Sequence, residues 1–370
     1  MKKIIVITHG YPIIGHPAKY QFVKELVQTW RKQGLDVTVI NPLTPKDWRA
    51  NRGAGSENEF FPLYHRFAFL KAVPFLRRAQ NAVQDFFFRR AAERCIRDYE
   101  NVVLYSHFLC AGNVAVRIAK KHNVEAYCAF GESTLWFLDD RNEKKADESI
   151  RALDGIVSVS SQNTRIIRER NWNDNVLEAP NAVDLSVFGV HGRDECREEL
   201  GFPKDKVIGI FVGHFIERKG PLRTQAASHG IDGLKMIYIG EGEQKPEDEN
   251  ILFCGGVDHS SLYKYLYAAD FFVLPTEAEG CCNAIVEALS CGLPVISSDG
   301  EFNDCILDDK NSIRVGADDV EALRSAMQTL VSDKEKREAM AAHIRSERDK
   351  YSIESRAAKI AAFIGAAQQR

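Results

Sequence analysis

The fold is decided by the stretch Glu279-Gly-Cys-Cys-Asn283-Ala-Ile-Val-Glu287-Ala-Leu-Ser-Cys-Gly292-Leu-Pro294-Val-Ile-Ser-Ser-Asp299. It follows Phe271-Phe-Val-Leu-Pro275-Thr276, which is typical of a buried strand that ends in a Pro/Thr stop. The order strand, loop, helix N-terminus and strand is where an α/β protein binds an anion. Because carboxylates repel a phosphate, Glu279 and Glu287 suit neutral hydroxyls, as on a sugar and a ribose. The combination predicts a nucleotide-sugar site.

A chain of 370 residues is long enough for two domains and a large core. Its 45% hydrophobic and 27% charged residues are ordinary for a globular protein, and no apolar run approaches the ~20 residues that span a bilayer. Two lysines precede the apolar run Ile4 to Ile7, but no cleavage site of small residues follows, so we expect a buried strand rather than a signal peptide. The nine cysteines form no C-x-x-C pair, which favours reduced cytosolic thiols over disulfides or zinc.

Charge is unevenly distributed along the chain. Residues 1–100 hold 17 Lys and Arg against 9 Asp and Glu, whereas the whole chain has a net charge of −3. A basic part joined to an acidic part indicates two domains with different partners. Because the chain is slightly acidic as a whole and shows no recognition motif, we expect no nucleic-acid partner.

Short apolar strands alternate with amphipathic helices, which predicts an α/β protein of two Rossmann-like, doubly wound domains. The expected strands are 4–8, 36–41, 102–106, 126–130 and 155–160, then 207–212, 235–239, 251–254, 270–274 and 294–297. The expected domains are 1–188 and 189–351. A helix over 320–340 precedes a last helix over 352–370, which is expected to cross back to the N-terminal domain with Ser352 as its N-cap.

A second phosphate-type element precedes the deciding stretch. Phe211-Val-Gly213-His-Phe-Ile-Glu217-Arg218-Lys219-Gly220 follows a buried strand and leads into a helix. Gly213 permits close approach of the backbone to a ligand, and Arg218 or Lys219 can donate to a diphosphate. Backbone N–H groups from Cys282 to Ala284 would face the same anion. The alternative is a plain strand-to-helix turn with solvated charges.

The two carboxylates of the deciding stretch are eight residues apart. Glu279 precedes the expected helix start and Glu287 follows it by about one turn, so they could contact groups about a nucleoside diphosphate apart. The alternative is that Glu287 only favours the helix dipole or pairs with a lysine.

Taken together, the motifs resemble the retaining glycosyltransferases of the GT-B fold, in the family 4 (group 1) grouping, whose E-x7-E signature matches residues 275–295. The supporting matches are Asn181-Ala-Val-Asp184 with Phe188 for the hinge, Gly213 to Gly220 for the phosphate motif, Ile239-Gly-Glu-Gly242 for a strand end and Phe253-Cys-Gly-Gly-Val257 for the base-contacting turn. They cover most of the chain, and the set is specific although each motif alone is weak.

The resemblance implies a role for each matched residue. Glu279 would bind donor-sugar hydroxyls and stabilise the developing oxocarbenium, and Glu287 would hold the ribose hydroxyls. Arg218 and Lys219 would neutralise the leaving diphosphate, so that no metal and no cofactor is required. The β-phosphate oxygen would take the acceptor proton as the new bond forms on the same face.

The implied site falls into three sets. The implied donor-binding residues are Gly213, His214, Arg218, Lys219, Gly240, Val257, Glu279, Gly280, Cys282, Asn283, Ala284 and Glu287. The implied catalytic residues are Glu279, Arg218, Lys219 and Glu132. The residues expected on the acceptor side, in the N-terminal domain, are Lys19, His107 and Glu132.

The sequence departs from the family pattern at several positions. His214 stands where the family usually has Arg, and Gly280-Cys281-Cys282 replaces G-F-G. The first loop lacks the family's glycine, so Lys19 is a candidate to contribute charge there. Glu132 follows a strand where the family often has His-Gly, and it is either a site residue or a helix cap. For His107 we favour a structural or acceptor-side role over a catalytic one.

Arginines and phenylalanines are interleaved between residues 66 and 97. A basic amphipathic helix with aromatic residues can lie on an anionic membrane, here the inner face of the cytoplasmic membrane. The alternative is that the phenylalanines belong to the core and the arginines to a solvated face.

We therefore expect a cytoplasmic hexosyltransferase that moves a sugar from a UDP- or GDP-linked donor to a saccharide or polyprenyl-linked acceptor, in bacterial surface polysaccharide or glycoconjugate synthesis. One alternative is a nucleotide-sugar epimerase of the same fold. The other is a non-catalytic sugar-nucleotide-binding partner in a polymer-assembly complex. A dinucleotide dehydrogenase is disfavoured because no G-x-G-x-x-G opens the first helix.

Overall fold

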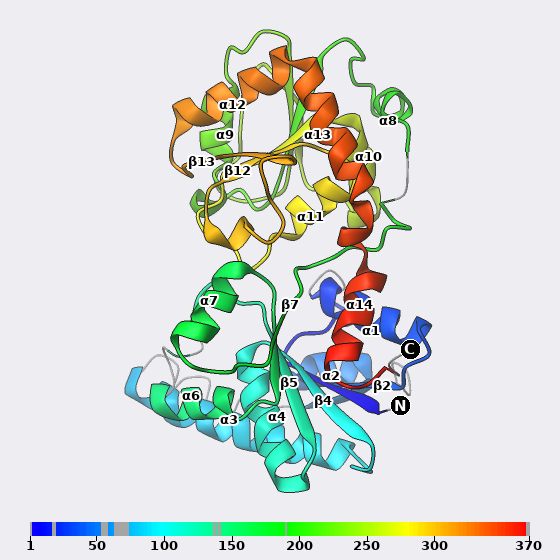
Figure 1. The fold of residues 1–370 in the computed structure, drawn as a ribbon, viewed down its shortest axis with the longest axis vertical. Helices are drawn as coiled ribbons and strands as arrows, with labels where there is room; N and C mark the ends of the chain where they lie inside the picture. The colour runs from blue at the N-terminus through cyan, green and yellow to red at the C-terminus, as the bar shows by residue number, and fades with distance from the viewer. Residues whose placement is uncertain are drawn as a thin grey trace. The chain divides into compact units, whose positions relative to one another are not determined.

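The computed structural model describes residues 2–16, 20–52, 58–62, 74–135, 138, 142–188 and 191–367, and for residues 58–62 and 74–78 it describes the backbone. Lys19 and the expected membrane-contact residues 66–73 lie outside the described residues. The chain divides into two compact units, Met1–Pro180 with Arg356–Arg370, and Asn181–Ser355 (Figure 1). The sequence placed this boundary at residue 188.

The first unit is built on a parallel sheet in the order β3-β2-β1-β4-β5-β6-β7 (Figure 1). Its strands are β1 (Lys3–Thr8), β2 (Val37–Leu43), β3 (Asn58–Pro62), β4 (Val102–His107), β5 (Glu125–Phe130), β6 (Gly155–Ser158) and β7 (Val176–Glu178). The β-branched run Ile4 to Ile7 forms the centre and is at most 3% exposed, as expected for a parallel strand covered on both faces. Ile5 lies opposite Thr38 on one side and Leu104 on the other.

Helices connect these strands and cover the sheet. They are α1 (Gln21–Lys32), α2 (Pro45–Asn51), α3 (Pro74–Cys95), α4 (Leu109–His122), α6 (Glu143–Arg151), α7 (Ser161–Glu169) and α14 (Ile353–Phe363). α4 packs against β4, β5, α3 and α6, and its apolar residues from Leu109 to Ala119 are buried in the core of the unit.

The last helix belongs to both units along the chain, because the division falls between Ser355 and Arg356. Its N-terminus is capped by Ser352, whose Oγ accepts from the N–H groups of Glu354 at 3.2 Å and Ser355 at 3.3 Å, which confirms the predicted cap. Further along, the Ala357 carbonyl accepts from Nε1 of the buried Trp30 at 2.8 Å, so α14 is fixed to α1 within the first unit.

The second unit repeats the architecture with a parallel sheet in the order β10-β9-β8-β11-β12-β13. Its strands are β8 (Val207–Val212), β9 (Leu234–Ile239), β10 (Ile251–Gly255), β11 (Phe271–Leu274), β12 (Val295–Ser298) and β13 (Ser312–Val315). Its helices are α8 (Arg193–Leu200), α9 (Pro221–Ser228), α10 (Leu262–Ala268), α11 (Asn283–Ser290), α12 (Val320–Ser332) and α13 (Lys334–Ser346). Short 3-10 turns are η2 (Glu217–Lys219), η3 (His259–Ser261), η4 (Glu301–Asn303) and η5 (Arg348–Tyr351).

The predicted α/β class with two doubly wound sheets is confirmed. The strands β3, β7 and β13 were not predicted, since they are short or polar. The single helix expected over 320–340 is two helices, because Asp333 lies between them and its carboxylate accepts from the N–H of Lys336 at 2.8 Å. Among the described residues, no helix is long and apolar enough to cross a membrane, and no three His, Cys, Asp or Glu side chains are grouped to hold a metal ion.

Candidate functional site

The carboxylate of Glu279 lies in the loop between β11 and α11 and receives three donors on one oxygen. Oε1 accepts from Nζ of Lys219, from Nη1 of Arg218 at 3.2 Å and from Oγ1 of Thr276 at 2.8 Å. The Glu279 side chain is 12% exposed, and within the described part of the chain its Oε2 makes no hydrogen bond. One oxygen is therefore fixed by protein and the other is available to a ligand hydroxyl.

The two cations come from η2, which follows β8, and they tie its loop to the loop after β11. The Arg218 guanidinium also donates to the carbonyl of Ala278, and the Arg218 carbonyl accepts from the Glu277 N–H at 2.9 Å. Arg218 is 41% exposed along its side chain, whereas that of Lys219 is only 11% exposed. Part of the Arg218 side chain is therefore exposed to solvent.

Lys219 is held in its charged form. Burial alone would lower its pKa, but Cys282 and the Glu279 carboxylate outweigh burial and raise it. Burial raises the pKa of the Cys282 thiol to about 12, so this thiol is neutral near pH 7. The Glu279 carboxylate is therefore the anion that stabilises the Lys219 ammonium.

The N-terminus of α11 lies beside this cluster. Cys282 is the N-cap and makes no side-chain capping bond, so the first N–H groups of the helix, including those of Asn283 and Ala284, have no cap from that side chain. Asn181 also holds this loop, because its amide donates to Oδ1 of Asn283 at 2.7 Å and to the carbonyl of Cys281 at 3.1 Å. Such a helix end, next to two cations, is suited to an anion.

Glu287 lies on the same helix, four residues after Asn283, which corresponds to about 6 Å along the axis. It is 8% exposed, and its Oε1 lies 3.0 Å from Nε2 of His259 on η3. The ring of His259 is half-exposed and also contacts the ring of Phe188 with a centroid distance of 5.8 Å. His259 therefore orients the Glu287 carboxylate. A carboxylate that only favoured the helix dipole would not need such a partner.

Two glycines, Gly213 after β8 and Gly240 after β9, bring the backbones of their loops close together. The Gly213 N–H donates to the carbonyl of Ile239 at 2.9 Å, and Gly240 follows with a φ of 153°. A Cβ on Gly240 would lie 1.9 Å from the carbonyl oxygen of Gly213, so only glycine fits there. His214 is exposed, and Val257 lies in the turn after β10.

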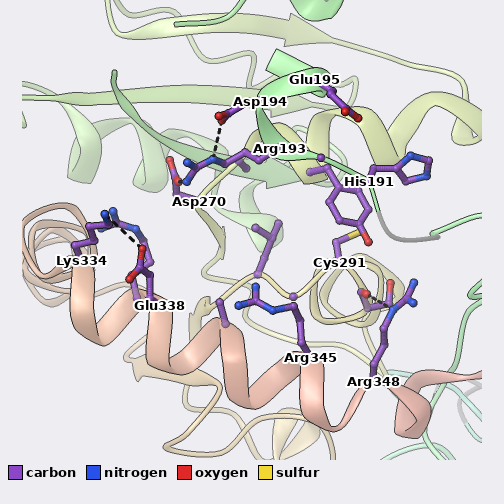
Figure 2. A pocket seen from close by; sticks show the side chains of 18 residues that line it. His191, Arg193, Asp194, Glu195, Asp270, Cys291, Lys334, Glu338, Arg345 and Arg348 are labelled. Carbon is purple, nitrogen blue, oxygen red and sulfur yellow. Dashed lines mark hydrogen bonds and ion pairs between the residues drawn. The ribbon is translucent and has the colours of Figure 1, made fainter. Parts of the chain in front are cut away.

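A cavity of about 570 Å³ lies at the other end of α11, beside Cys291 and the helix α13 (Figure 2). Most of its charges are already paired. Arg193 lies 2.9 Å from Asp270 and Lys334 lies 3.6 Å from Glu338. None of the predicted donor-site residues lines this cavity.

In the first unit, Glu132 is buried at the N-terminus of α4. Its Oε1 accepts from the Leu109 N–H at 2.7 Å and its Oε2 from the Gly131 N–H at 3.1 Å. Burial raises the pKa of this carboxyl to about 7 against the opposing effect of these N–H groups. Glu132 therefore makes the predicted helix-cap contact, and its pKa also suits proton exchange near neutrality.

His107 ends β4 and is 2% exposed, packed against the rings of Phe22 and Phe108. Burial, and then the charge of Arg356, lower the pKa of His107 to about 3, so the imidazole is neutral at physiological pH. Its Nδ1 makes no hydrogen bond to any residue that the structure describes. The next residue, Phe108, has a φ of 72°, a conformation that non-glycine residues adopt at a cost.

The structure thus brings together Arg218, Lys219 and Glu279 and places them beside the N-terminus of α11. His107 and Glu132 belong to the first unit. The sequence analysis missed Thr276 and His259 and named Asn181 only as part of the hinge motif. Thr276 could have been found from the Pro/Thr stop that ends the strand before Glu279. Nothing in the sequence around His259 indicates its contact with Glu287, which is 28 positions away.

Three comparisons describe what the chain is similar to. Residues 206–333 match a family model described as glycosyl transferases group 1. A protein of Bacillus subtilis (strain 168) that carries the name of a teichuronic acid biosynthesis glycosyltransferase, TuaC, is 27% identical over 325 residues, which cover 80% of this chain and 81% of the relative. Sucrose-phosphate synthase of Thermosynechococcus elongatus superposes with a TM-score of 0.77 at 18% identity, over 98% of both chains. Anabaena Alr3699/HepE in complex with UDP superposes with a TM-score of 0.73 at 12% identity, over 99% of this chain and 100% of the other.

Replacement of Gly213 by alanine should weaken ligand binding without changing the stability of the fold. The new Cβ would meet its nearest neighbour, the Phe211 ring, at 3.6 Å, which is ordinary contact. We expect Gly213→Ala to keep the thermal unfolding temperature of the wild type but to bind UDP at least ~10-fold more weakly, because the methyl group fills the space that a diphosphate would occupy. Gly240→Ala is the contrasting variant and should unfold at a lower temperature. Calorimetric titration that gives Gly213→Ala the wild-type affinity would contradict diphosphate approach at this backbone.

The buried carboxyl of Glu132 should make the first unit less stable as the pH rises. Its folded pKa of about 7 lies above the ordinary 4.5, so its contribution to stability is complete below pH 4.5 and is lost as the pH rises through 7. The loss is about 3 kcal/mol at most. Glu132→Gln cannot ionise, so its free energy of unfolding should fall less than that of the wild type between pH 4.5 and 7. Denaturant unfolding at several pH values that gave parallel curves would argue against the raised pKa.

Proposed function

We propose a retaining, metal-independent sugar transfer for this chain, which is a glycosyltransferase of group 1 with the GT-B fold. The observation that carries the proposal is the Glu279 carboxylate held by Lys219, Arg218 and Thr276 next to the N-terminus of α11. Two cations and a helix N-terminus suit a diphosphate, and a carboxylate oxygen that makes no hydrogen bond to the described residues suits a sugar hydroxyl.

The donor is a nucleoside diphosphate sugar, with uridine or guanosine as its base. Its diphosphate binds Lys219, Arg218 and the first N–H groups of α11, and Glu287 accepts from the ribose hydroxyls. The turn at Val257 lies by the base. The superposition with a protein in complex with UDP supports the fold of such a site, and the contacts of Glu287 with His259 support its orientation.

The reaction proceeds on one face of the donor sugar. The acceptor hydroxyl oxygen forms a bond to the anomeric carbon on the side from which the diphosphate departs. The bond from that carbon to the phosphate oxygen breaks with its electron pair, and the hydroxyl proton passes to the released β-phosphate oxygen. Lys219 and Arg218 stabilise the charge of the leaving group, and Glu279 stabilises the cationic sugar through its hydroxyls.

The acceptor is a saccharide or a polyprenyl-linked saccharide in surface polysaccharide synthesis. The similarity to the Bacillus protein named for teichuronic acid biosynthesis supports this class of product. Glu132, with a pKa of about 7, is the acceptor-side residue whose protonation can change near neutral pH.

The exposed residues of α3 support the proposal that this helix contacts an anionic membrane surface. Its residues Val83, Phe86 and Phe87 are 40%, 46% and 55% exposed and recur at helical spacing with the exposed Arg90 and Arg94. Phe88, on another side of the helix, is fully buried. Exposed aromatic residues followed by arginines are typical of a helix that lies on anionic lipid, so these two phenylalanines do not belong to the core.

Substitution of the two site carboxylates should separate chemistry from donor binding. Glu279→Gln should lower kcat by about 10²–10³-fold, because it removes charge stabilisation of the transition state. Glu287→Gln should mainly raise the donor KM, by roughly 10-fold, because a ribose contact to a charged acceptor is weakened. Steady-state assays with UDP- and GDP-sugars measure both.

The matched control for these variants is Glu277→Gln, which changes a neighbouring carboxylate that is 41% exposed and pairs with Arg223 at 2.9 Å. The control should keep wild-type kinetics. Wild-type kcat/KM in both site variants would contradict the assignment. Incubation with the nucleotide sugar alone tests the epimerase alternative, because only an epimerase converts the donor without an acceptor.

Removal of the exposed phenylalanines should weaken membrane binding. The double variant Phe86→Ser with Phe87→Ser should bind vesicles that contain phosphatidylglycerol at least ~10-fold more weakly, because two aromatic side chains no longer leave water. Leu222→Ser, which removes a side chain that is 42% exposed on α9, is the matched control. Equal sedimentation of the double variant and the wild type with these vesicles would exclude α3 as the contact.

A further inference from the structure

The cavity of about 570 Å³ beside α13 contains none of the residues that the proposed function uses. It lies within the second unit, between one face of α13, the first turn of α8 and the turn that follows α11 (Figure 2). The side chains that α13 contributes recur every three or four residues from Lys334 to Arg345, so they share one face of the helix. Five of the described lining side chains are Lys or Arg and four are Asp or Glu, which suits a charged ligand.

The buried carboxylate of the cavity is shared by two guanidinium groups. Asp270 accepts from Nη1 of Arg193 at 2.9 Å and from Nη2 of the buried Arg197 at 2.6 Å. On α13, Glu338 lies 3.6 Å from Lys334. Since Arg197 lies behind the wall and adds to the five lining cations, the region has a surplus of positive charge.

Arg345 is the cation of this cavity that is available to a ligand. Its guanidinium makes no hydrogen bond or ion pair with any residue that the structure describes, and it points from α13 toward the middle of the cavity (Figure 2). A Cβ on Gly292 would lie 3.0 Å from Cγ of Arg345, and Gly292 has a left-handed φ of 82°. The glycine therefore leaves the space through which the Arg345 side chain passes.

Two further arginines of the cavity donate to backbone carbonyls and to none of the described carboxylates. Arg348 donates through Nε to the Ser290 carbonyl at 2.9 Å and through Nη2 to the carbonyl of Phe188. Arg337 donates through Nη1 to the carbonyl of Leu330. These hydrogen bonds hold the two guanidinium groups in place but do not neutralise their charge.

The chemistry of the free donors indicates the ligand. A guanidinium presents N–H groups in a planar fork that matches the oxygens of a phosphate, and it stays charged at any physiological pH. None of the large exposed apolar side chains in the described part of the chain lines this cavity, so it does not belong to a face that would meet lipid. The geometry therefore favours a phosphate on a soluble molecule over a lipid headgroup.

We propose that this cavity binds the phosphate group of a soluble phosphorylated molecule, with the guanidinium of Arg345 as its main contact and those of Arg337 and Arg348 beside it. The cavity lies at the C-terminal end of α11, whereas Lys219 and Glu279 lie beside the N-terminal end of that helix. The proposal therefore goes beyond the proposed function and does not depend on it.

The test is calorimetric titration of the full chain with inorganic phosphate. Arg345→Gln removes a charge that bonds to no described residue, so the variant should keep the wild-type unfolding temperature and yet bind phosphate at least ~10-fold more weakly. The matched control is Lys336→Gln, which removes an exposed charge from the same helix at a position that does not line the cavity. The control should bind phosphate like the wild type.

The cations beside Glu279 can also attract phosphate, so the titration is repeated in the background of Lys219→Gln. There Arg345→Gln should cause the same loss. The proposal would be overturned by wild-type phosphate affinity in Arg345→Gln, by an equal loss in Lys336→Gln, by a loss that Lys219→Gln alone produces, or by a wild type that does not bind phosphate. Weaker sedimentation of Arg345→Gln with phosphatidylglycerol vesicles, at unchanged phosphate affinity, would also overturn it, because the ligand would then be a lipid surface.

Discussion

The ion pair between Lys219 and Glu279 is the interaction on which the proposed donor site depends. Burying an ammonium or a carboxylate alone is costly. At the carboxyl ends of β8 and β11, the charge of each group offsets the desolvation cost of burying the other. The pair fixes one carboxylate oxygen and leaves the second for a ligand. In the proposed function, an incoming diphosphate competes for the same ammonium and for the part of the Arg218 side chain that is exposed to solvent. The cations and the carboxylate that the proposed function assigns to the donor are therefore in contact with each other.

The two units divide the chemistry between them. The second unit presents cations and a helix N-terminus, which recognise charge, and carboxylates beside them, which recognise hydroxyls. The first unit holds Glu132, the acceptor-side residue of the proposed function, at the N-terminus of α4. Its helix α3 adds exposed aromatic residues and arginines. This division agrees with the basic and acidic parts of the sequence, where the charge of α3 contributes to the excess of the first hundred residues.

The sequence predicted the two sheets, because strands such as Ile4 to Ile7 are apolar throughout. The Pro/Thr stop after the strand 270–274 predicted that Glu279 lies in the loop before a helix. Two phosphate-type elements in one half of the chain also predicted that Lys219 faces the same anion as the helix start after Glu279. In the structure these elements meet because β8 and β11 are neighbouring parallel strands whose carboxyl ends share an edge. The sequence did not predict His259 next to Glu287. It offered a helix cap as one interpretation of Glu132 but did not say that the capped helix is α4, because such contacts join segments that only the folded chain brings together. Nor could it choose between core and surface for the phenylalanines of α3. Three consecutive phenylalanines look alike in sequence, but only Phe88 of 86–88 points into the core.

The central claim is that Glu279, Lys219 and Glu287 form one binding site for a nucleoside diphosphate sugar. A crystal structure of the protein with UDP-glucose or a GDP-sugar tests it most directly. We expect the diphosphate within hydrogen-bond distance of Lys219 and the first N–H groups of α11, the ribose hydroxyls at Glu287 and a sugar hydroxyl at Oε2 of Glu279. A nucleotide bound in the cavity beside α13, or anywhere that leaves the Glu279 and Glu287 carboxylates without a ligand contact, would contradict it.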